Sequence, residues 1–245
     1  MKNAPVISVK NLIKSFGENH VLRNFSLVLE RGENLAVLGK SGSGKSVLIK
    51  CIINLIEADD GQIIVLDQNI NDLTKDELDQ LRARVGFLFQ SNALYDSMTV
   101  RENLEFPLRV HWDKAKREEE SESAVIDALR DVGLEHTIDM MPAELSGGMR
   151  KRIALARTLI LKPSIILYDE PTTGLDPITA REISELIVTV QQKYNTSSII
   201  ISHDMNCIHQ TSNRVIMLID GKCYANDTFA NLRTSSDAKV REFFD

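Results

Sequence analysis

The sequence has few cysteines and no long apolar stretch, and both shortages narrow the class of protein. Its three cysteines, Cys51, Cys207 and Cys223, are scattered and form no C-x-x-C pair. This argues against a disulfide framework or a cysteine metal site and indicates reduced thiols. The longest apolar runs, such as residues 215–219, are strand-sized, whereas a membrane-spanning helix needs about 20 apolar residues. We therefore expect no transmembrane segment, and residues 1–10 show no signal-peptide pattern.

Basic residues are also in deficit. Lys and Arg number 29 against 35 Asp and Glu, a net charge of -6, which argues against nucleic acid as a partner. No internal repeat or low-complexity linker is visible. With 245 residues, 43% of them apolar, the chain is long enough for one large domain or two small ones. We expect a cytoplasmic protein that reaches a membrane only through another chain.

The most informative segment is the glycine-rich run GKSGSGKS at residues 39–46. Apolar residues 35–38 predict a buried strand before it and residues 47–56 a helix after it, the context that the pattern G-x-x-x-x-G-K-[ST] requires. Glycines there let backbone N–H groups point at phosphate oxygens, next to the positive end of the helix. We assign the whole segment to phosphate binding: Gly39, Lys40, Ser41, Gly42, Ser43, Gly44, Lys45 and Ser46. Lys45 would reach the β- and γ-phosphates and Ser46 would ligate Mg²⁺, so the segment predicts a bound nucleoside triphosphate.

A second motif ends the apolar run at residues 165–168. Asp169 and Glu170 follow this run directly. Asp169 would hold the hydration shell of Mg²⁺, and Glu170 would polarise the attacking water. A strand with an acidic turn is common by itself, but the phosphate loop upstream favours a functional role. His203 follows another apolar run, where a lone histidine is more often structural than functional.

Strands alternate with helices along most of the chain. This alternation predicts a parallel α/β sheet with ligands at the carboxyl ends of its strands. We expect strands near residues 6–9, 25–29, 35–38, 61–66, 85–89, 164–168, 198–201 and 214–218. Helices are expected near 47–56, 74–81, 99–133 and 178–193, and one more after Ser146. The charged run 113–122 predicts a solvated helix or loop. The pattern is that of one α/β core with a helical insertion.

Residues 145–149, LSGGM, closely resemble the LSGGQ signature of ABC-type ATPases. Four further positions match motifs of that family: Phe16 the adenine-stacking aromatic, Gln90 the Q-loop glutamine, Asp176 the D-loop aspartate and His203 the switch histidine. The resemblance covers essentially the whole chain. Two positions depart from the family, with Met149 for glutamine and Phe16 for a common tyrosine. Neither replaces a phosphate contact or Glu170, so hydrolysis is still expected.

The resemblance implies a P-loop NTPase fold of the ABC type, in one nucleotide-binding domain over residues 6–245. Its RecA-like core would take residues 6–90 and 156–235, with an antiparallel β subdomain on the N-terminal side, a helical subdomain at 91–155 and a tail at 236–245. It also implies an ATPase that uses ATP and Mg²⁺, with Glu170, His203 and Gln90 catalytic and Ser46, Gln90 and Asp169 at the metal.

In the family, the signature of one subunit meets the ATP of its partner. The resemblance therefore implies a head-to-tail homodimer that sandwiches two ATP molecules. The opposite nucleotide would be contacted by Ser146, Gly147, Gly148 and Met149, with Asp176 helping to align the two sites.

The amino-acid sequences of residues 87–109 and 141–152 resemble those of ATPases that serve Mla/Mce-type phospholipid transporters. This likeness implies membrane permease subunits, an Mce-domain lipid-binding protein and a place on the cytoplasmic face of the inner membrane. Some relatives also bind a small STAS-domain regulator, and no residue here decides for or against it. Leu94, Tyr95, Met98 and Phe106 are expected to form an exposed protein-binding patch. The tail residues Val240, Phe243 and Phe244 are expected to pack on their own chain rather than on a partner subunit.

Three alternatives remain at this point. The chain fits the ATPase of another ABC importer or exporter equally well in its catalytic residues. A second role is regulation of a cell-wall or division partner without transport. The third, a soluble ABC protein of DNA repair or translation, is disfavoured because the chain has neither a second such domain nor a long coiled-coil insertion, and because it is acidic.

Overall fold

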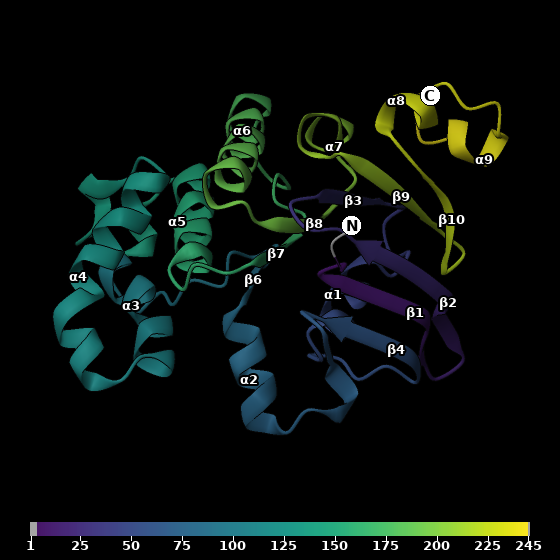
Figure 1. Ribbon diagram of the computed structural model, residues 1–245. Coiled ribbons are helices and arrows are strands. Elements are labelled where there is room, and N and C mark those ends of the chain that lie inside the picture. The colour runs from purple at the N-terminus through teal and green to yellow at the C-terminus, as the bar shows by residue number, and fades with distance from the viewer. Residues whose placement is uncertain (1–3, 245) are drawn as a thin grey trace.

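The computed structural model describes residues 4–244, which build two sheets and a separate group of helices (Figure 1). The smaller sheet is antiparallel with the order β2-β1-β4-β5. Its strands are β1 (Ile7–Phe16), β2 (Asn19–Leu29), β4 (Asp60–Val65) and β5 (Gln68–Asn69). This sheet lies on the N-terminal side of the fold, as expected.

The larger sheet has the order β10-β9-β3-β8-β7-β6. Its strands are β3 (Asn34–Leu38), β6 (Val85–Leu88), β7 (Ile165–Asp169), β8 (Ser197–Ser202), β9 (Arg214–Ile219) and β10 (Lys222–Asp227). All neighbours pair in parallel except β10, which lies antiparallel against β9. The predicted α/β class with a parallel sheet is confirmed.

Nine α-helices lie in the described part of the chain. They are α1 (Lys45–Ile52), α2 (Lys75–Ala83), α3 (Val100–His111), α4 (Lys114–Asp131), α5 (Gly147–Leu159), α6 (Pro177–Tyr194), α7 (Met205–Thr211), α8 (Phe229–Arg233) and α9 (Ala238–Arg241). Among the described residues, no helix is both long and apolar enough to cross a membrane. Helices α3, α4 and α5 form the group at the left of Figure 1, with their own apolar core.

Both faces of the larger sheet are covered, which explains why its strands are continuous apolar runs. Side chains alternate between the two faces of a strand. In β7, Ile165 and Leu167 face a core shared with α1 and the smaller sheet, while Ile166 and Tyr168 face a core shared with α5 and α6. The covered sheet holds the carboxyl ends of β3, β7 and β8 at fixed positions.

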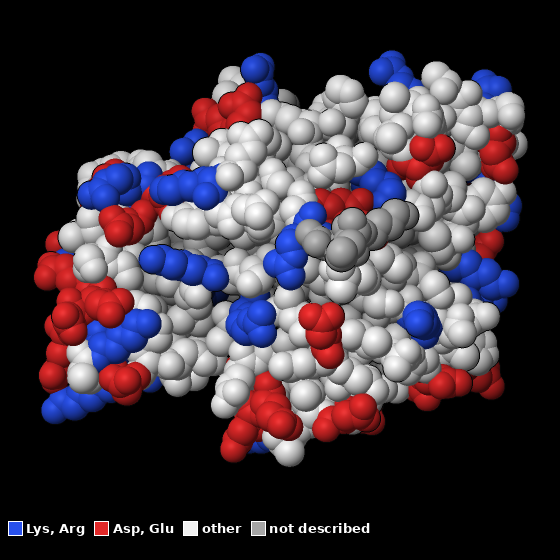
Figure 2. All heavy atoms as spheres, viewed as in Figure 1, with Lys and Arg blue, Asp and Glu red and all other residues white. Residues whose placement is uncertain are grey.

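Some elements differ from the expected ones. The helical stretch 99–133 is two helices, because Trp112 is extended and Asp113 caps α4 by accepting a hydrogen bond from Lys116 N at 2.9 Å. The first half of α4 is exposed, and Figure 2 shows side chains of both signs over these helices, as expected for a solvated segment. The patterns did not predict β10, α7, α8 or α9.

The C-terminal segment packs on its own chain, the arrangement that we expect from its apolar residues. Val240 is buried in a cluster with residues of β3 and β9. The Phe244 ring lies 5.4 Å from that of Phe229. Glu242 pairs with Lys40 of the glycine-rich loop, with 3.0 Å between Nζ and Oε2. The tail therefore extends the core beside that loop.

Candidate active site

The glycine-rich loop follows β3 and leads directly into α1. Its conformation requires glycine at two positions. Gly44 precedes α1 with φ = +100°, and a Cβ there would lie 2.5 Å from Cγ1 of Val21. A Cβ on Gly39 would lie 2.8 Å from the carbonyl oxygen of Leu218. The loop thus packs against β2 and β9 in a shape that other residues cannot adopt without strain.

Lys45 is the first residue of α1, and its side chain reaches back into this loop. Its side chain is buried, and Nζ donates hydrogen bonds to Gly39 O at 2.8 Å and Lys40 O at 3.2 Å. Glu170 Oε1 is 3.8 Å from the same nitrogen. Burial lowers the pKa of Lys45 from its ordinary value, and the charges of Glu170 and Asp169 oppose this change. The loop therefore holds a positive charge among backbone groups, an arrangement that suits an anionic phosphate.

Ser46 and Asp169 form the second part of the site. Ser46 Oγ donates to Asp169 Oδ1 at 2.8 Å, which joins the start of α1 to the end of β7. Burial raises the pKa of Asp169 above that of an ordinary aspartate. A hydroxyl and a carboxylate are the hard oxygen ligands that Mg²⁺ prefers. Residues 4–244 contain no group of three or more His, Cys, Asp or Glu placed to hold a metal, and Mg²⁺ commonly takes few protein ligands beside water and phosphate. The residues fit magnesium.

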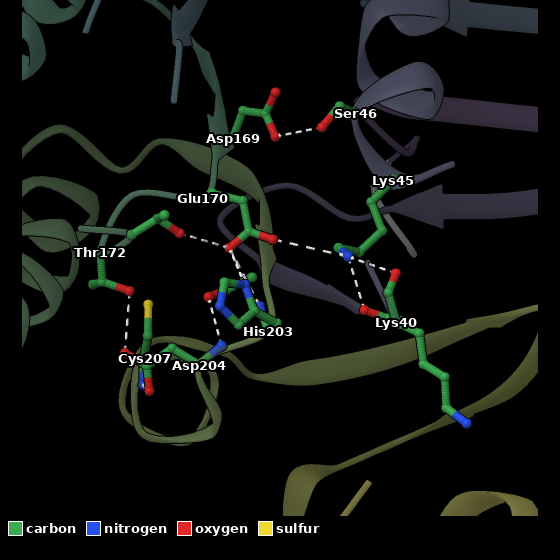
Figure 3. Close-up of polar contacts among 12 residues, drawn as sticks. Lys40, Lys45, Ser46, Asp169, Glu170, Thr172, His203, Asp204 and Cys207 are labelled. Carbon is green, nitrogen blue, oxygen red and sulfur yellow. Dashed lines mark hydrogen bonds and ion pairs between the residues drawn. The ribbon is translucent and has the colours of Figure 1, made fainter. Parts of the chain in front are cut away.

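Glu170 and His203 form the third part (Figure 3). Glu170 Oε2 lies 2.8 Å from His203 Nδ1 and accepts a hydrogen bond from Thr173 Oγ1 at 3.2 Å. The backbone of Glu170 has φ = +51°, a left-handed conformation that costs about 1 kcal/mol or more outside glycine. A hydrogen bond from Glu170 N to Ile201 O at 2.9 Å holds that conformation. The carboxylate is consequently fixed beside Lys45.

These parts open onto one cavity of about 460 Å³. The predicted residues that line it are Phe16, Ser41, Gly42, Gly44, Lys45, Ser46, Gln90, Glu170 and His203. Phe16 presents its ring there at 49% exposure, as a stacking platform would. Asp169 joins the cavity through Ser46, whereas Gly39, Lys40 and Ser43 belong to the loop without lining the cavity.

The signature residues lie elsewhere. None of Ser146, Gly147, Gly148, Met149 and Asp176 lines the cavity. Ser146 caps α5 by accepting a hydrogen bond from Met149 N at 3.2 Å. Asp176 caps α6 by accepting hydrogen bonds from Ile178 N and Thr179 N, both at 3.1 Å. Gly148 packs against Thr179, so the two helix N-termini lie side by side.

The contact between Gly148 and Thr179 predicts different costs for two adjacent glycines. In Gly148→Ala the new Cβ would lie 2.5 Å from Thr179 Cγ2, and Thr179 cannot rotate without losing its hydrogen bond to Asp176 Oδ2. We expect a loss of about 1–3 kcal/mol in the free energy of unfolding, measured by urea denaturation without nucleotide. Gly147→Ala is the matched control, since its Cβ would meet only Leu175 Cδ2 at 3.8 Å. Equal stabilities of the two variants would contradict the packing argument.

Three residues near the site were not predicted from the sequence. Thr173 bonds Glu170, as described. Lys151, which is 1% exposed, donates from Nζ to Gln90 O at 3.0 Å. Arg157 donates to the carbonyls of two residues that follow Gln90. Helical periodicity in α5 marks a buried face, but it does not tell which cations turn toward a neighbouring loop.

Comparison with known proteins adds four likenesses: a family model, two relatives and a solved structure. The family model described as ABC transporter matches residues 22–173. The chain is 36% identical over 241 residues to the intermembrane phospholipid transport system ATP-binding protein MlaF of Haemophilus influenzae, which covers 98% of this chain and 90% of that protein. It is 35% identical over 252 residues to the methionine import ATP-binding protein MetN of Campylobacter jejuni, covering 97% of this chain and 75% of that protein. A dimeric ATP-binding cassette, solved in a post-hydrolysis state with ADP and Pi, superposes with a TM-score of 0.82 at 32% identity, over 91% of this chain and 98% of that one.

Proposed function

This chain belongs to the ABC transporter family as an ATP-binding and ATP-hydrolysing subunit, and we propose that the transporter that it drives moves phospholipids. The observation that carries the proposal is the agreement of two likenesses. Residues 87–109 and 141–152 resemble the corresponding segments of Mla/Mce-type ATPases in sequence. The phospholipid transport protein of Haemophilus influenzae matches 98% of the chain. The catalytic residues alone would suit any member of the family.

The proposed hydrolysis uses the three parts of the site in turn. The loop N–H groups and Lys45 bind the phosphates, and Lys45 Nζ exchanges its bonds with Gly39 O and Lys40 O for phosphate oxygens. Ser46 and Asp169, joined at 2.8 Å, would hold Mg²⁺ together with Gln90, which lines the same cavity. When bound, the metal neutralises charge on the phosphate oxygens.

Glu170 is the proposed general base. Its Oε2 is held by Thr173 Oγ1 and His203, so that it can orient a water molecule and accept its proton. Phe16 would stack on the base of the nucleotide from the end of β1.

We further propose a head-to-tail homodimer. The signature residues at the start of α5 do not line the cavity of their own chain, and Ser146 and Gly147 are exposed. A helix N-terminus of this kind binds anions, so it would serve the ATP of a second copy. A related cassette that binds ADP and Pi is a dimer, which supports this arrangement.

The loop before α3 is the proposed contact for a membrane permease. Buried Asn103 makes three hydrogen bonds to the backbone of this loop: its Oδ1 accepts from Tyr95 N at 2.8 Å, and its Nδ2 donates to the carbonyls of Tyr95 and Met98 at 3.1 and 3.0 Å. Tyr95 is 43% exposed, with its ring 4.9 Å from that of Phe106. Leu94, Met98 and Phe106 were expected to be exposed as well, but all three are half-buried. Leu94 packs against the apolar core of α3, α4 and α5. A permease would meet mainly Tyr95 and the rim of this loop.

Methionine import is the second candidate, since MetN of Campylobacter jejuni is as similar over the chain as the phospholipid relative. The two candidates require different permeases. No residue of this chain identifies an Mce-domain partner or a STAS-domain regulator.

A pull-down separates these candidates. Tagged Glu170→Gln protein is captured from its own cells in mild detergent with Mg-ATP, followed by proteomics and lipid analysis. We expect a permease together with an Mce-domain protein and phospholipid. A methionine permease would overturn the lipid proposal, and a cell-wall hydrolase regulator would favour signalling without transport. Lys45→Ala protein serves as the matched control, because it should not bind the ATP that closes the dimer.

A further inference from the structure

The loop that follows β6 holds two residues in the left-handed region and is closed by one turn hydrogen bond, from Asn92 N to Phe89 O at 3.1 Å. Asn92 and Ala93 have φ of +65° and +51°, in the left-handed region that costs about 1–2 kcal/mol for an alanine. The side-chain oxygen of Asn92 is buried and has no hydrogen-bond partner among the described residues. This short loop also begins with Gln90, which lines the nucleotide cavity. Contacts from outside the loop add to this single hydrogen bond and reach Gln90 itself.

Those contacts come from one helix, α5. Arg157 Nη1 donates to Ala93 O at 2.8 Å, and Nη2 donates to Asn92 O at 3.0 Å. Lys151 Nζ donates to Gln90 O at 3.0 Å. Two cations thus hold three of the four carbonyls between residues 90 and 93. The three carbonyls belong to Gln90 and to the two left-handed residues, Asn92 and Ala93.

The charge on Lys151 is costly where it lies, whereas Arg157 is half-buried, with its guanidinium 5.9 Å from the centre of the Tyr95 ring. Lys151 is 1% exposed, and within residues 4–244 neither Lys151 nor Arg157 has a carboxylate at ion-pair distance. Burial of an unpaired cation costs several kcal/mol unless hydrogen bonds offset it. A methionine would fill the place of Lys151 without that cost. We therefore attribute the presence of a lysine at this position to its hydrogen bond with the carbonyl of Gln90.

The same helix begins at the signature. Ser146 caps α5, and Gly147 is its first residue. Because a helix is a rigid element, a displacement of its N-terminus is transmitted to the residues farther along it. We propose that Lys151 and Arg157 are positioning residues that tie Gln90 to the signature helix, so that engagement of the signature sets Gln90 against the metal of its own chain. This proposal rests on the proposed role of Gln90 at Mg²⁺.

The test is a Mg²⁺ titration of ATP hydrolysis in Lys151→Met and Arg157→Met. Loss of a group that orients a metal ligand commonly costs about 10–100-fold in metal affinity or activity. We expect kcat to fall by about 10-fold and the Mg²⁺ concentration for half-maximal rate to rise by a similar factor. Binding of a fluorescent ATP analogue in EDTA should stay within about twofold, since the phosphate loop is unchanged. A purely structural role would not change the Mg²⁺ requirement.

Arg152→Met is the matched control on the same helix. Its guanidinium pairs with Glu182 of α6 at 2.6 Å and makes no hydrogen bond to the loop of Gln90. We expect wild-type kcat and Mg²⁺ dependence from this variant. Should Lys151→Met fold poorly, Arg157→Lys keeps the charge and loses the forked pair of hydrogen bonds, and its Mg²⁺ requirement should rise in the same direction.

Combination with Gln90→Ala decides whether Lys151 acts through Gln90. In that case, Lys151→Met added to Gln90→Ala lowers the rate no further. Full additivity of the two effects, or wild-type Mg²⁺ dependence of Lys151→Met, would overturn the positioning proposal. A wild-type rate of Gln90→Ala alone would remove the proposed role of Gln90 itself. The two failures are thus distinguished.

Discussion

Lys45→Ala is expected to abolish measurable ATP binding. Lys45 supplies the one buried cation inside the loop, and its Nζ lies where the glycine-rich backbone converges, 2.8 Å from Gly39 O. Hydrogen bonds to charged groups contribute about 1.5–3 kcal/mol each, and this ammonium would serve two phosphates. We therefore expect the Kd for ATP to rise by at least about 100-fold, as measured by isothermal titration calorimetry.

The control for this substitution is a lysine far from the cavity. Lys114 is an exposed residue at the start of α4, where it pairs with Glu118 at 3.6 Å. Lys114→Ala removes the same charge from the chain and should leave ATP binding unchanged. An affinity of Lys45→Ala close to that of Lys114→Ala would show that the loop does not use its lysine for phosphate.

Glu170→Gln is expected to retain ATP binding and lose most turnover. Glutamine has the shape of glutamate, and its amide oxygen can still accept the hydrogen bond from Thr173 Oγ1. What it cannot do is take a proton from water, and the loss of a positioned general base commonly costs about 10²–10⁴ in rate. The measurement is phosphate release at saturating Mg-ATP, beside the Kd from calorimetry.

The oligomeric state of the same variant tests the proposed dimer. If hydrolysis is blocked while two ATP molecules join the subunits, Mg-ATP should shift Glu170→Gln from monomer to dimer in size-exclusion chromatography with light scattering. Removal of Mg²⁺ with EDTA is a useful comparison, because it blocks hydrolysis in the wild-type protein as well. Glu185→Gln, at an exposed glutamate of α6, should behave as wild type. Turnover of Glu170→Gln at the wild-type rate would exclude Glu170 as the base.

Much of the candidate site could be predicted because the residues that form it are adjacent in the sequence. The phosphate loop needs glycines, a lysine and a serine at fixed spacing between a strand and a helix, and all of these lie within residues 39–46. The pair Asp169 and Glu170 likewise ends one apolar strand. Burial of both sheet faces makes those strands continuous apolar runs, so the sequence also predicts the parallel α/β core.

Contacts between distant segments were decided by the tertiary structure. Ser46 and Asp169 are 123 residues apart in the chain and 2.8 Å apart in space. Lys151 and Gln90 are separated by 61 residues, yet Nζ bonds the carbonyl at 3.0 Å. A helical pattern shows that a face is buried, but the partner of a buried cation depends on which loop the fold brings to it.

The surface before α3 also combines a feature that the sequence predicts with one that only the packing determines. Its residue types identify an apolar segment, whereas in the folded protein, where Asn103 bonds the backbone of Tyr95, Tyr95 is exposed and its apolar neighbours are half-buried. Local sequence thus determined the nucleotide chemistry, since spacing along the backbone controls which groups meet a phosphate. Only the tertiary structure decided how the signature helix holds Gln90 and which apolar side chains before α3 are exposed, because both depend on packing between elements far apart in the chain.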